Sequence, residues 1–204
     1  YSGNSSTSST FFAEYSDSNN FTMWNIKDSS QVLQIFGYDG GSYEYNLITN
    51  RKFRDTNAWY HIVVAFDSTQ STASDRIKIY VNGVQETSFS TATYPSQNLQ
   101  PRIANGNRTQ FVGAGSASGN YWDGSMSHVH YSSGYAYAAS TFGSTDSTTG
   151  EWKINTSPSV TYGGQGFFIL KDGNSVTDQS GESHNLTVGG GTLTKTEDCP
   201  SNVF

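Results

Sequence analysis

The carboxylates are the side chains that could carry acid–base chemistry in this chain, and they are few. Hydrolysis of a glycosidic bond needs two carboxyl groups, roughly 5 to 9.5 Å apart. On one strand such a pair takes positions i and i+2 or i and i+4, which project from one face. Glu44 and Glu86 have no acidic neighbour at those spacings, and Glu14 is followed by Asp17 at the wrong parity. The sequence therefore predicts a protein without enzyme activity.

Histidines offer a second kind of chemistry, proton transfer or metal binding. His128 and His130 alternate on one predicted strand and should therefore share a face. No carboxylate or third histidine stands at a spacing that would complete a metal site, so outward polar positions explain the pair better. We expect His61 to be a half-buried strand residue.

Tyrosines beside glycine-rich turns are candidates for sugar binding. Aromatic faces stack on sugar rings, while nearby polar groups and backbone bind the hydroxyls. Two segments, GYDGGSYEYN at 37–46 and GYAYA at 134–138, have this character. The candidate glycan-binding residues are Tyr38, Tyr43, Tyr45, Tyr135 and Tyr137. Aromatic residues in strands more often pack in a core or between subunits, so a structural role remains the alternative for each.

Strands must position these side chains, because no long stretch repeats apolar residues at helical spacing. Short runs rich in Thr, Val, Ile, Tyr and Phe recur between Gly, Asn, Asp and Ser, which is typical of an antiparallel sandwich or barrel. We predict strands over residues 10–16, 21–27, 31–37, 42–48, 59–66, 76–82, 84–90, 109–114, 121–131, 166–170 and 184–188. Loops are predicted over 132–150, with one helical turn, and over 155–165 and 188–191.

The clearest strand pattern lies within residues 57–83, NAWYHIVVAFDSTQSTASDRIKIYVNG. Both faces of 59–66 are apolar, which predicts a central strand that is covered on both sides. In 76–82 apolar and polar residues alternate, as in a half-solvated strand. The Asn82-Gly83 pair then predicts a type I′ turn into a hairpin with 84–90.

Composition restricts the classes of function. The 204 residues fit one domain over 1–204, with residues 189–204 as a C-terminal tail. A net charge of −6 argues against nucleic acid as a partner, because phosphate binding needs clustered Lys and Arg. No run approaches the roughly 20 apolar residues of a membrane span, so no membrane insertion is expected. The single cysteine, Cys199, cannot form an internal disulfide. Because the chain begins at Tyr1 without a methionine, we expect it to be a processed product or part of a longer polypeptide.

Residues 57–83 resemble the laminin-G-like, concanavalin A-like jelly-roll superfamily. In that superfamily a strand of the type W-x-H-I-V-V-x-F-D precedes a hairpin of the type I-K-I-Y-V-N-G, and both are present here. The segment YWDGSMSHVHY at 121–131 is similar to a later aromatic-D-G strand of such domains. The resemblance implies an all-β fold, a concanavalin A-like jelly-roll sandwich of two antiparallel sheets.

Calcium is the usual ion of proteins with this resemblance, held by loop oxygen atoms. Asp67 and Asp75 bracket the loop within 57–83, and Asp123 would supply a third carboxylate. These three residues are the candidate Ca²⁺ ligands. Two acids eight residues apart do not specify a cage of six to eight oxygens, so we expect no cofactor, with Ca²⁺ at these three residues as the alternative.

Later segments are similar to a narrower group, the lectin-like structural proteins of marine tailed phages, cyanophages in particular. The matching segments are STFGSTDSTTGEWKI (140–154), YGGQGFFILKD (162–172), SGESHNLTV (180–188) and the ending TEDCPSNVF. This resemblance implies a non-enzymatic structural or adhesion module on the virion surface, as a tail fibre, an appendage or a capsid decoration. Its expected partners are other virion subunits, copies of itself in a homo-oligomer, and host surface glycans. A purely architectural subunit without a ligand, and a glycan hydrolase, are the alternatives.

Overall fold

The computed structural model describes residues 8–27, 29–105, 108–117, 119–171, 175–190, 192–196 and 198–200. Contacts between Cα atoms divide the chain into two compact units. Unit 1 consists of Tyr1–Ala58, Asp67–Lys78 and Glu86–Gly124, and unit 2 of Trp59–Phe66, Ile79–Gln85 and Ser125–Phe204. The prediction of a single domain with a C-terminal tail is not tested by this division and stays a prediction.

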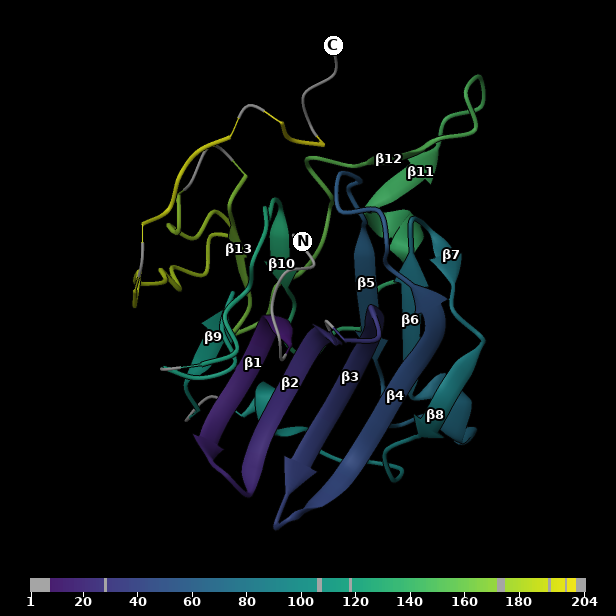
Figure 1. Ribbon diagram of the computed structural model, residues 1–204, viewed down its shortest axis with the longest axis vertical. Coiled ribbons are helices and arrows are strands. Elements are labelled where there is room, and N and C mark those ends of the chain that lie inside the picture. Colours follow the sequence, from purple (N-terminus) through teal and green to yellow (C-terminus); the bar gives the residue numbers. More distant parts are fainter. Residues whose placement is uncertain are drawn as a thin grey trace. The chain divides into compact units, whose positions relative to one another are not determined.

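The described residues form thirteen strands and three short 3₁₀ helices (Figure 1). The strands are β1 (Ser9–Asp17), β2 (Asn20–Lys27), β3 (Val32–Asp39), β4 (Ser42–Lys52), β5 (Ile62–Phe66), β6 (Ile77–Val81), β7 (Val84–Gln85), β8 (Phe89–Thr93), β9 (Gln110–Val112), β10 (Val129–Tyr131), β11 (Gly143–Thr145), β12 (Trp152–Ile154) and β13 (Phe167–Ile169). The 3₁₀ helices are η1 (Ala73–Asp75), η2 (Arg102–Ala104) and η3 (Ala139–Thr141).

Unit 1 contains a six-stranded sheet with the order β8-β4-β3-β2-β1-β9. Each of its neighbouring strands pairs antiparallel. Gly40 and Gly41 join β3 to β4 with φ angles of 56° and 84°. Both angles lie in the left-handed region, which a two-residue type I′ hairpin turn requires and which glycine adopts without steric cost. Consecutive hairpins therefore build the centre of this sheet.

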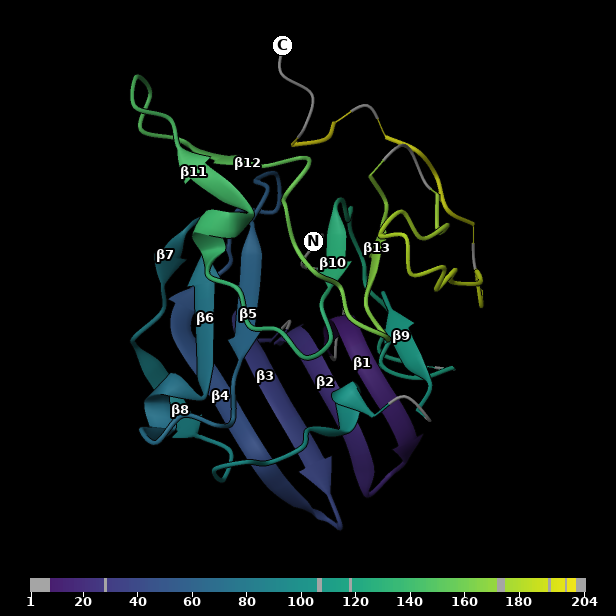
Figure 2. The ribbon, with the colours of Figure 1, turned by 180° about the vertical axis from the view of Figure 1, so that it is seen from behind.

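The register assigns side chains of β1 to β4 to two faces of this sheet, because successive residues of a strand point to opposite sides. The front face carries Thr10, Ala13, Tyr15, Phe21, Met23, Asn25, Gln34, Phe36, Tyr38, Tyr43 and Asn46. The rear face carries Phe12, Glu14, Thr22, Trp24, Leu33, Ile35, Gly37, Tyr45 and Leu47. In Figure 2 helix η2 lies in front of the sheet, on its rear face. The rear face holds the apolar core of unit 1, where Leu33, Ile35 and Leu47 are fully buried.

Unit 2 contains shorter pairings. The order β5-β6-β7 forms one sheet, whose strand β6 begins in unit 1, and β10 pairs with β13 while β11 pairs with β12. Asn82 and Gly83 turn β6 into β7 with φ angles of 47° and 79°. Val81 then faces Val84 across the hairpin. The predicted type I′ turn is confirmed, and so is the all-β, antiparallel class.

Two strand predictions in the 57–90 region need correction. Residues 59–61 lie outside a strand. The backbone N–H of His61 donates to the side-chain oxygen of Asn82, and the carbonyl of His61 accepts from the backbone N–H of Asn82. β5 is the first strand in its sheet order and mostly half-buried, so the prediction of a doubly covered central strand was wrong. The predicted strand 84–90 is two strands, β7 and β8, and β8 joins the six-stranded sheet instead.

Further corrections concern the later half of the chain. Of the predicted strand 121–131 only β10 forms, because Gly124 and His128 have positive φ angles that interrupt an extended backbone. The helical turn predicted within 132–150 is η3, but strand β11 was missed there, as was β12 just after it. Residues 184–188 form no strand.

Candidate ligand-binding site

Four aromatic rings lie in a line on the front face of unit 1, at the end of the sheet that carries the Gly40-Gly41 turn. We call Tyr15, Phe21, Tyr38 and Tyr43 the aromatic row. The register places them as direct cross-strand neighbours from β1 to β4. Successive ring centroids are 6.1, 5.2 and 5.1 Å apart. One strand after another thus contributes a ring to a continuous apolar surface.

Packing along one side fixes the orientation of these rings. Phe36 is buried beside the row on the same face and meets Phe21 at 5.7 Å and Tyr43 at 5.6 Å, both edge to face. Edge-to-face contacts of this kind are the preferred geometry of aromatic pairs. Tyr43 is nevertheless 50 % exposed, and the three other rings are half-buried. The row therefore offers rigid aromatic surface to solvent, which is the requirement for stacking on a sugar ring.

Tyr45, predicted to belong with Tyr38 and Tyr43, points the other way. In a regular strand Tyr43 and Tyr45 would share a face, but a bulge shifts the register so that Tyr38 pairs with Tyr43 and Gly37 with Tyr45. The ring of Tyr45 is fully buried over Gly37 on the rear face. This corrects the sequence-based candidate set, since a buried ring has no face to offer to a ligand.

Tyr135 and Tyr137 form a second aromatic pair, in unit 2. Their rings stack with centroids 6.1 Å apart, and Tyr135 is about as exposed as Tyr43. The hydroxyl of Tyr137 accepts a hydrogen bond from the backbone N–H of Thr161 at 2.8 Å. Tyr137 thus fastens a loop, while Tyr135 remains a surface ring.

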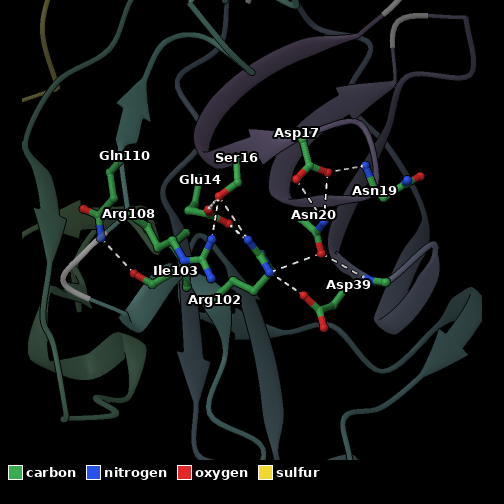
Figure 3. A network of polar contacts seen from close by, with 11 residues as sticks. Glu14, Ser16, Asp17, Asn19, Asn20, Asp39, Arg102, Ile103, Arg108 and Gln110 are labelled. Carbon is green, nitrogen blue, oxygen red and sulfur yellow. Dashed lines mark hydrogen bonds and ion pairs between the residues drawn. The ribbon is translucent and has the colours of Figure 1, made fainter.

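A polar network lies on the rear face behind the aromatic row (Figure 3). Its centre is Arg102 of η2, whose side chain is mostly buried. The guanidinium donates to Glu14 at 3.1 Å and to the hydroxyl of Ser16 at 3.0 Å, and it forms an ion pair with Asp39. Burial lowers the pKa of Arg102, but the hydrogen bonds that it donates to Glu14 and Asp39, with the negative charges of both, outweigh burial and raise that pKa above its usual value.

Asn20 extends this network to both hairpin ends. Its amide nitrogen donates to Asp17 at 2.8 Å, and its amide oxygen accepts from the backbone N–H of Gly40 at 3.1 Å. A second link joins the N–H of Gly41 to the carbonyl of Asn19 at 3.2 Å. These bonds hold the β1–β2 and β3–β4 turns together and so keep the aromatic row in register.

Glu44 occupies the bulge of β4. Burial raises the pKa of its carboxyl, and the negative charge of Asp39 raises it further. Sequence spacing did not reveal this proximity, because the hairpin turn brings Asp39 and Glu44 together from two strands. A carboxyl with a raised pKa near an ionised one is the electrostatic arrangement that acid–base pairs use. In this protein the carboxylate of Asp39 forms an ion pair with the guanidinium of Arg102.

The three aspartates predicted to bind calcium are not assembled into one site. The carboxylate of Asp67 accepts hydrogen bonds from Thr69 and Gln70 within its own turn, which lower its pKa. Asp75 pairs with Lys78 at 3.1 Å. No group of three His, Cys, Asp or Glu residues that could hold a metal ion occurs among the described residues, so Asp67, Asp75 and Asp123 do not form such a group. Calcium binding stays a prediction without a ligand group.

The histidines of unit 2 pack against aromatic rings. His130 stacks on Phe168 with centroids 3.9 Å apart, and its Nδ1 lies 2.8 Å from the hydroxyl of Tyr162. His128 has a positive φ and lies just before β10. The prediction of two outward-facing histidines is therefore wrong for His130, which is half-buried between rings. His61 is half-buried as predicted and stacks on Trp152.

Comparison with known families agrees with this architecture. The family described as the concanavalin A-like lectin/glucanases superfamily matches residues 1–140. The chain belongs to this superfamily. Membership confirms the expected fold class, a jelly-roll β-sandwich of antiparallel sheets. The searches of curated proteins and of solved structures each found no match.

The matched region of this superfamily member contains all of β1 to β10 and both faces of the six-stranded sheet. The residues after 140 lie outside it. The part of the chain that the structure describes contains no helix with the length and hydropathy of a membrane span.

Proposed function

We propose that this protein is a non-enzymatic carbohydrate-binding module that uses the aromatic row as its platform. The observation that carries the proposal is the half-exposed ring of Tyr43 at the end of a packed line of rings. Aromatic faces beside polar groups are the usual means of binding sugars in β-sandwiches. The superfamily includes lectins by its description, which supports the same class of ligand.

Its proposed place is the surface of a virion, as a tail fibre, an appendage or a capsid decoration of a tailed phage. The resemblance of 140–154, 162–172 and 180–188 to phage structural proteins supports this setting. Other virion subunits and copies of the chain in a homo-oligomer are the proposed partners, and host surface glycan is the proposed ligand. Many copies on one particle would convert weak single-site affinity into durable attachment.

A glycan array probed with the full chain tests the proposal, followed by calorimetric titration of any glycan that binds. Replacing Tyr43 by Ala removes the most exposed ring of the row, and we expect affinity to fall about tenfold, the equivalent of ~1.4 kcal/mol. Tyr121→Ala is the matched control, since Tyr121 is similarly exposed and lies outside the row. Equal affinity of the Tyr43 and Tyr121 variants would reject the row as the platform.

The same experiments address the other candidates. If Tyr135→Ala weakens glycan binding and Tyr43→Ala does not, the pair in unit 2 is the binding surface. If no glycan binds and Tyr43→Ala instead dissociates an oligomer in sedimentation velocity, the row is an architectural interface. If the protein releases reducing sugar from a bound glycan and the Glu44→Gln variant does not, the hydrolase alternative is favoured. The raised pKa of Glu44 is the observation behind this alternative.

A further inference from the structure

The β11–β12 hairpin of unit 2 contacts its neighbours through two aromatic side chains, and each of them meets a histidine (green in Figure 1). The indole of Trp152, on β12, donates through its Nε1–H to Nδ1 of His61 at 2.9 Å. The ring of Phe142, just before β11, lies 5.3 Å from the imidazole of His130, centroid to centroid. His61 comes just before β5 and His130 lies on β10. The hairpin is therefore docked through contacts that involve two imidazoles.

The bond between Trp152 and His61 fixes the protonation state of the imidazole. An indole nitrogen only donates, so Nδ1 of His61 must accept, and the ring is neutral with its proton on Nε2. The two ring planes lie within 20° of parallel, which lets the in-plane N–H point at the in-plane lone pair. A proton added to Nδ1 would place two donors 2.9 Å apart with no acceptor between them. Protonation of His61 at Nδ1 must therefore break this bond.

Close packing leaves the indole of Trp152 little room to adjust. A Cβ atom on Gly83, in the β6–β7 turn, would lie 2.2 Å from the ring, and one on Gly143, on β11, would lie 2.7 Å from it. The ring thus rests directly on the backbone of both glycines. In an interior packed this closely, the indole cannot move away from a charged imidazole without also leaving the turn.

The groups around His61 do not offset a positive charge on its ring. Burial and, to a smaller extent, the charge of His128 lower the pKa of His61 to about 4, and no carboxylate among the described residues raises it. Glu151 and Lys153, the neighbours of Trp152 in the chain, are both exposed and project to the opposite face of the hairpin. The β6–β7 turn presents only an uncharged amide to His61.

His130 responds to acid later than His61. Burial and the charges of His128 and His61 lower the pKa of His130 to about 3. The hydroxyl of Tyr162 lies 2.8 Å from Nδ1 of His130, and it stays protonated because burial raises its pKa to about 12. A hydroxyl can either donate or accept, so this second contact does not force two donors together. The contact between Trp152 and His61 is therefore the first to break as pH falls.

The hairpin itself is held by bonds that survive in mild acid. The carboxylate of Asp146 accepts from Lys153 at 2.6 Å and from the backbone N–H groups of Thr148 and Thr149 at 2.8 and 3.0 Å. The bond from Lys153 and then those from the backbone hold the pKa of Asp146 well below its usual value. The hairpin should therefore stay intact and move as one piece.

We propose that the Trp152–His61 contact is a pH-sensitive switch, in which protonation of His61 releases the β11–β12 hairpin from the β6–β7 turn while the sheets stay folded. This inference does not rest on the proposed function. The released hairpin uncovers the indole of Trp152 and the glycine backbone beneath it, so mild acid creates an apolar surface that is covered at neutral pH.

The test follows the indole N–H of Trp152 in ¹H–¹⁵N spectra of the full chain between pH 7.5 and 4.5. Trp152→Phe identifies its signal among those of the four tryptophans. Hydrogen exchange of this N–H is compared with that of free tryptophan at the same pH, and amides of β3 and β4 report whether the chain stays folded. Because a released imidazole has a pKa near 6.5, the population of released hairpin should rise about tenfold per pH unit between pH 6 and 4.5.

His61→Asn separates the imidazole proton from the hydrogen bond. Its amide oxygen lies close to the position of Nδ1 and accepts from Trp152, but it takes up no proton in this range, so exchange of the indole should become independent of pH. His184→Asn is the matched control, because it makes the same change at a histidine whose Nδ1 donates to the carbonyl of Gly166 instead, 2.9 Å away. This control should keep the wild-type response.

Three outcomes decide the proposal. Acid-dependent loss of indole protection in wild type and His184→Asn, absent in His61→Asn and with the β3 and β4 amides still protected, supports it. Simultaneous loss of protection at the indole and at those amides overturns it, because acid then unfolds the whole chain. An indole that stays protected down to pH 4.5, or that responds equally in His61→Asn, overturns it as well. Where His61→Asn lowers the thermal unfolding midpoint at pH 7.5, His61→Gln replaces it.

Discussion

The guanidinium of Arg102 lies 3.1 Å from the carboxylate of Glu14, which stands 88 positions earlier in the chain and is fully buried. The pair joins η2 to the rear face of the sheet, directly behind strands that carry the aromatic row (Figure 3). Removing one partner of a buried ion pair is far more costly than removing both, because a single charge is left without compensation.

Replacing Arg102 by Met should therefore lower the free energy of unfolding by about 3 kcal/mol or more. The double variant Arg102→Met with Glu14→Gln should recover part of that loss, since the unpaired charge is gone. Urea unfolding monitored by tryptophan fluorescence measures both. Lys153→Met, which breaks an exposed ion pair with Asp146, is the control and should leave the midpoint unchanged. Equal losses in the single and double variants would show that the charge of Glu14 is not what Arg102 compensates.

Two independent features make any residue other than glycine unfavourable at position 83. The φ angle of Gly83 is 79°, and the indole of Trp152 lies 2.2 Å from where a Cβ atom would be. Gly83→Ala should therefore lower stability by about 2 kcal/mol or more, the sum of backbone strain and a steric clash. Gly41 has a similar φ of 84° but nothing within 4 Å of its Cβ position. The variant Gly41→Ala isolates the backbone contribution, and thermal unfolding compares the two. A Gly83 variant no less stable than the Gly41 variant would mean that Trp152 does not pack closely on this turn.

The sequence predicts best where structure is set locally. The Asn82-Gly83 turn and the β6–β7 hairpin follow from two residues whose backbone preferences are strong. Tyr38 and Tyr43 were predictable as candidates, because glycine-rich turns with flanking tyrosines are visible in one short segment. Strand β11 was missed because its Ser and Thr content also fits a loop.

Non-local geometry accounts for what the sequence could not show. Tyr45 was assigned to the surface because alternation predicts it beside Tyr43, whereas the bulge that reverses it depends on the pairing of β3 with β4. Tyr15 and Phe21 belong to the aromatic row only through cross-strand register, which no single strand contains. The proximity of Asp39 to Glu44 likewise arises from a hairpin rather than from spacing along one strand.

Acid should destabilise the protein through two histidines of unit 2, since burial and, to a smaller extent, the charge of His128 together lower the pKa of His61 to about 4 and that of His130 to about 3. Tyr162, Phe168 and Trp152 face these imidazoles, and the pKa of Tyr162 is raised to about 12, mainly by burial, so its hydroxyl stays protonated.

The folded-state pKa values of His61 and His130 both lie below the unfolded value near 6.5, so the unfolded chain binds more protons as pH falls. Stability should then be fully present above pH 6.5 and decline toward pH 4, by at most about 1.4 kcal/mol per pH unit for each histidine. Carboxylates with a lowered pKa, such as Asp67, contribute stability that is lost mainly below about 3.8. The raised pKa of Glu44 makes falling pH favour the folded state, so Glu44 opposes the histidines, but equally in wild type and variant. Urea midpoints between pH 7.5 and 4.5 measure the slope, and His130→Asn, which retains an acceptor for Tyr162, should roughly halve it. Identical slopes in wild type and variant would show that His130 is protonated equally in both states.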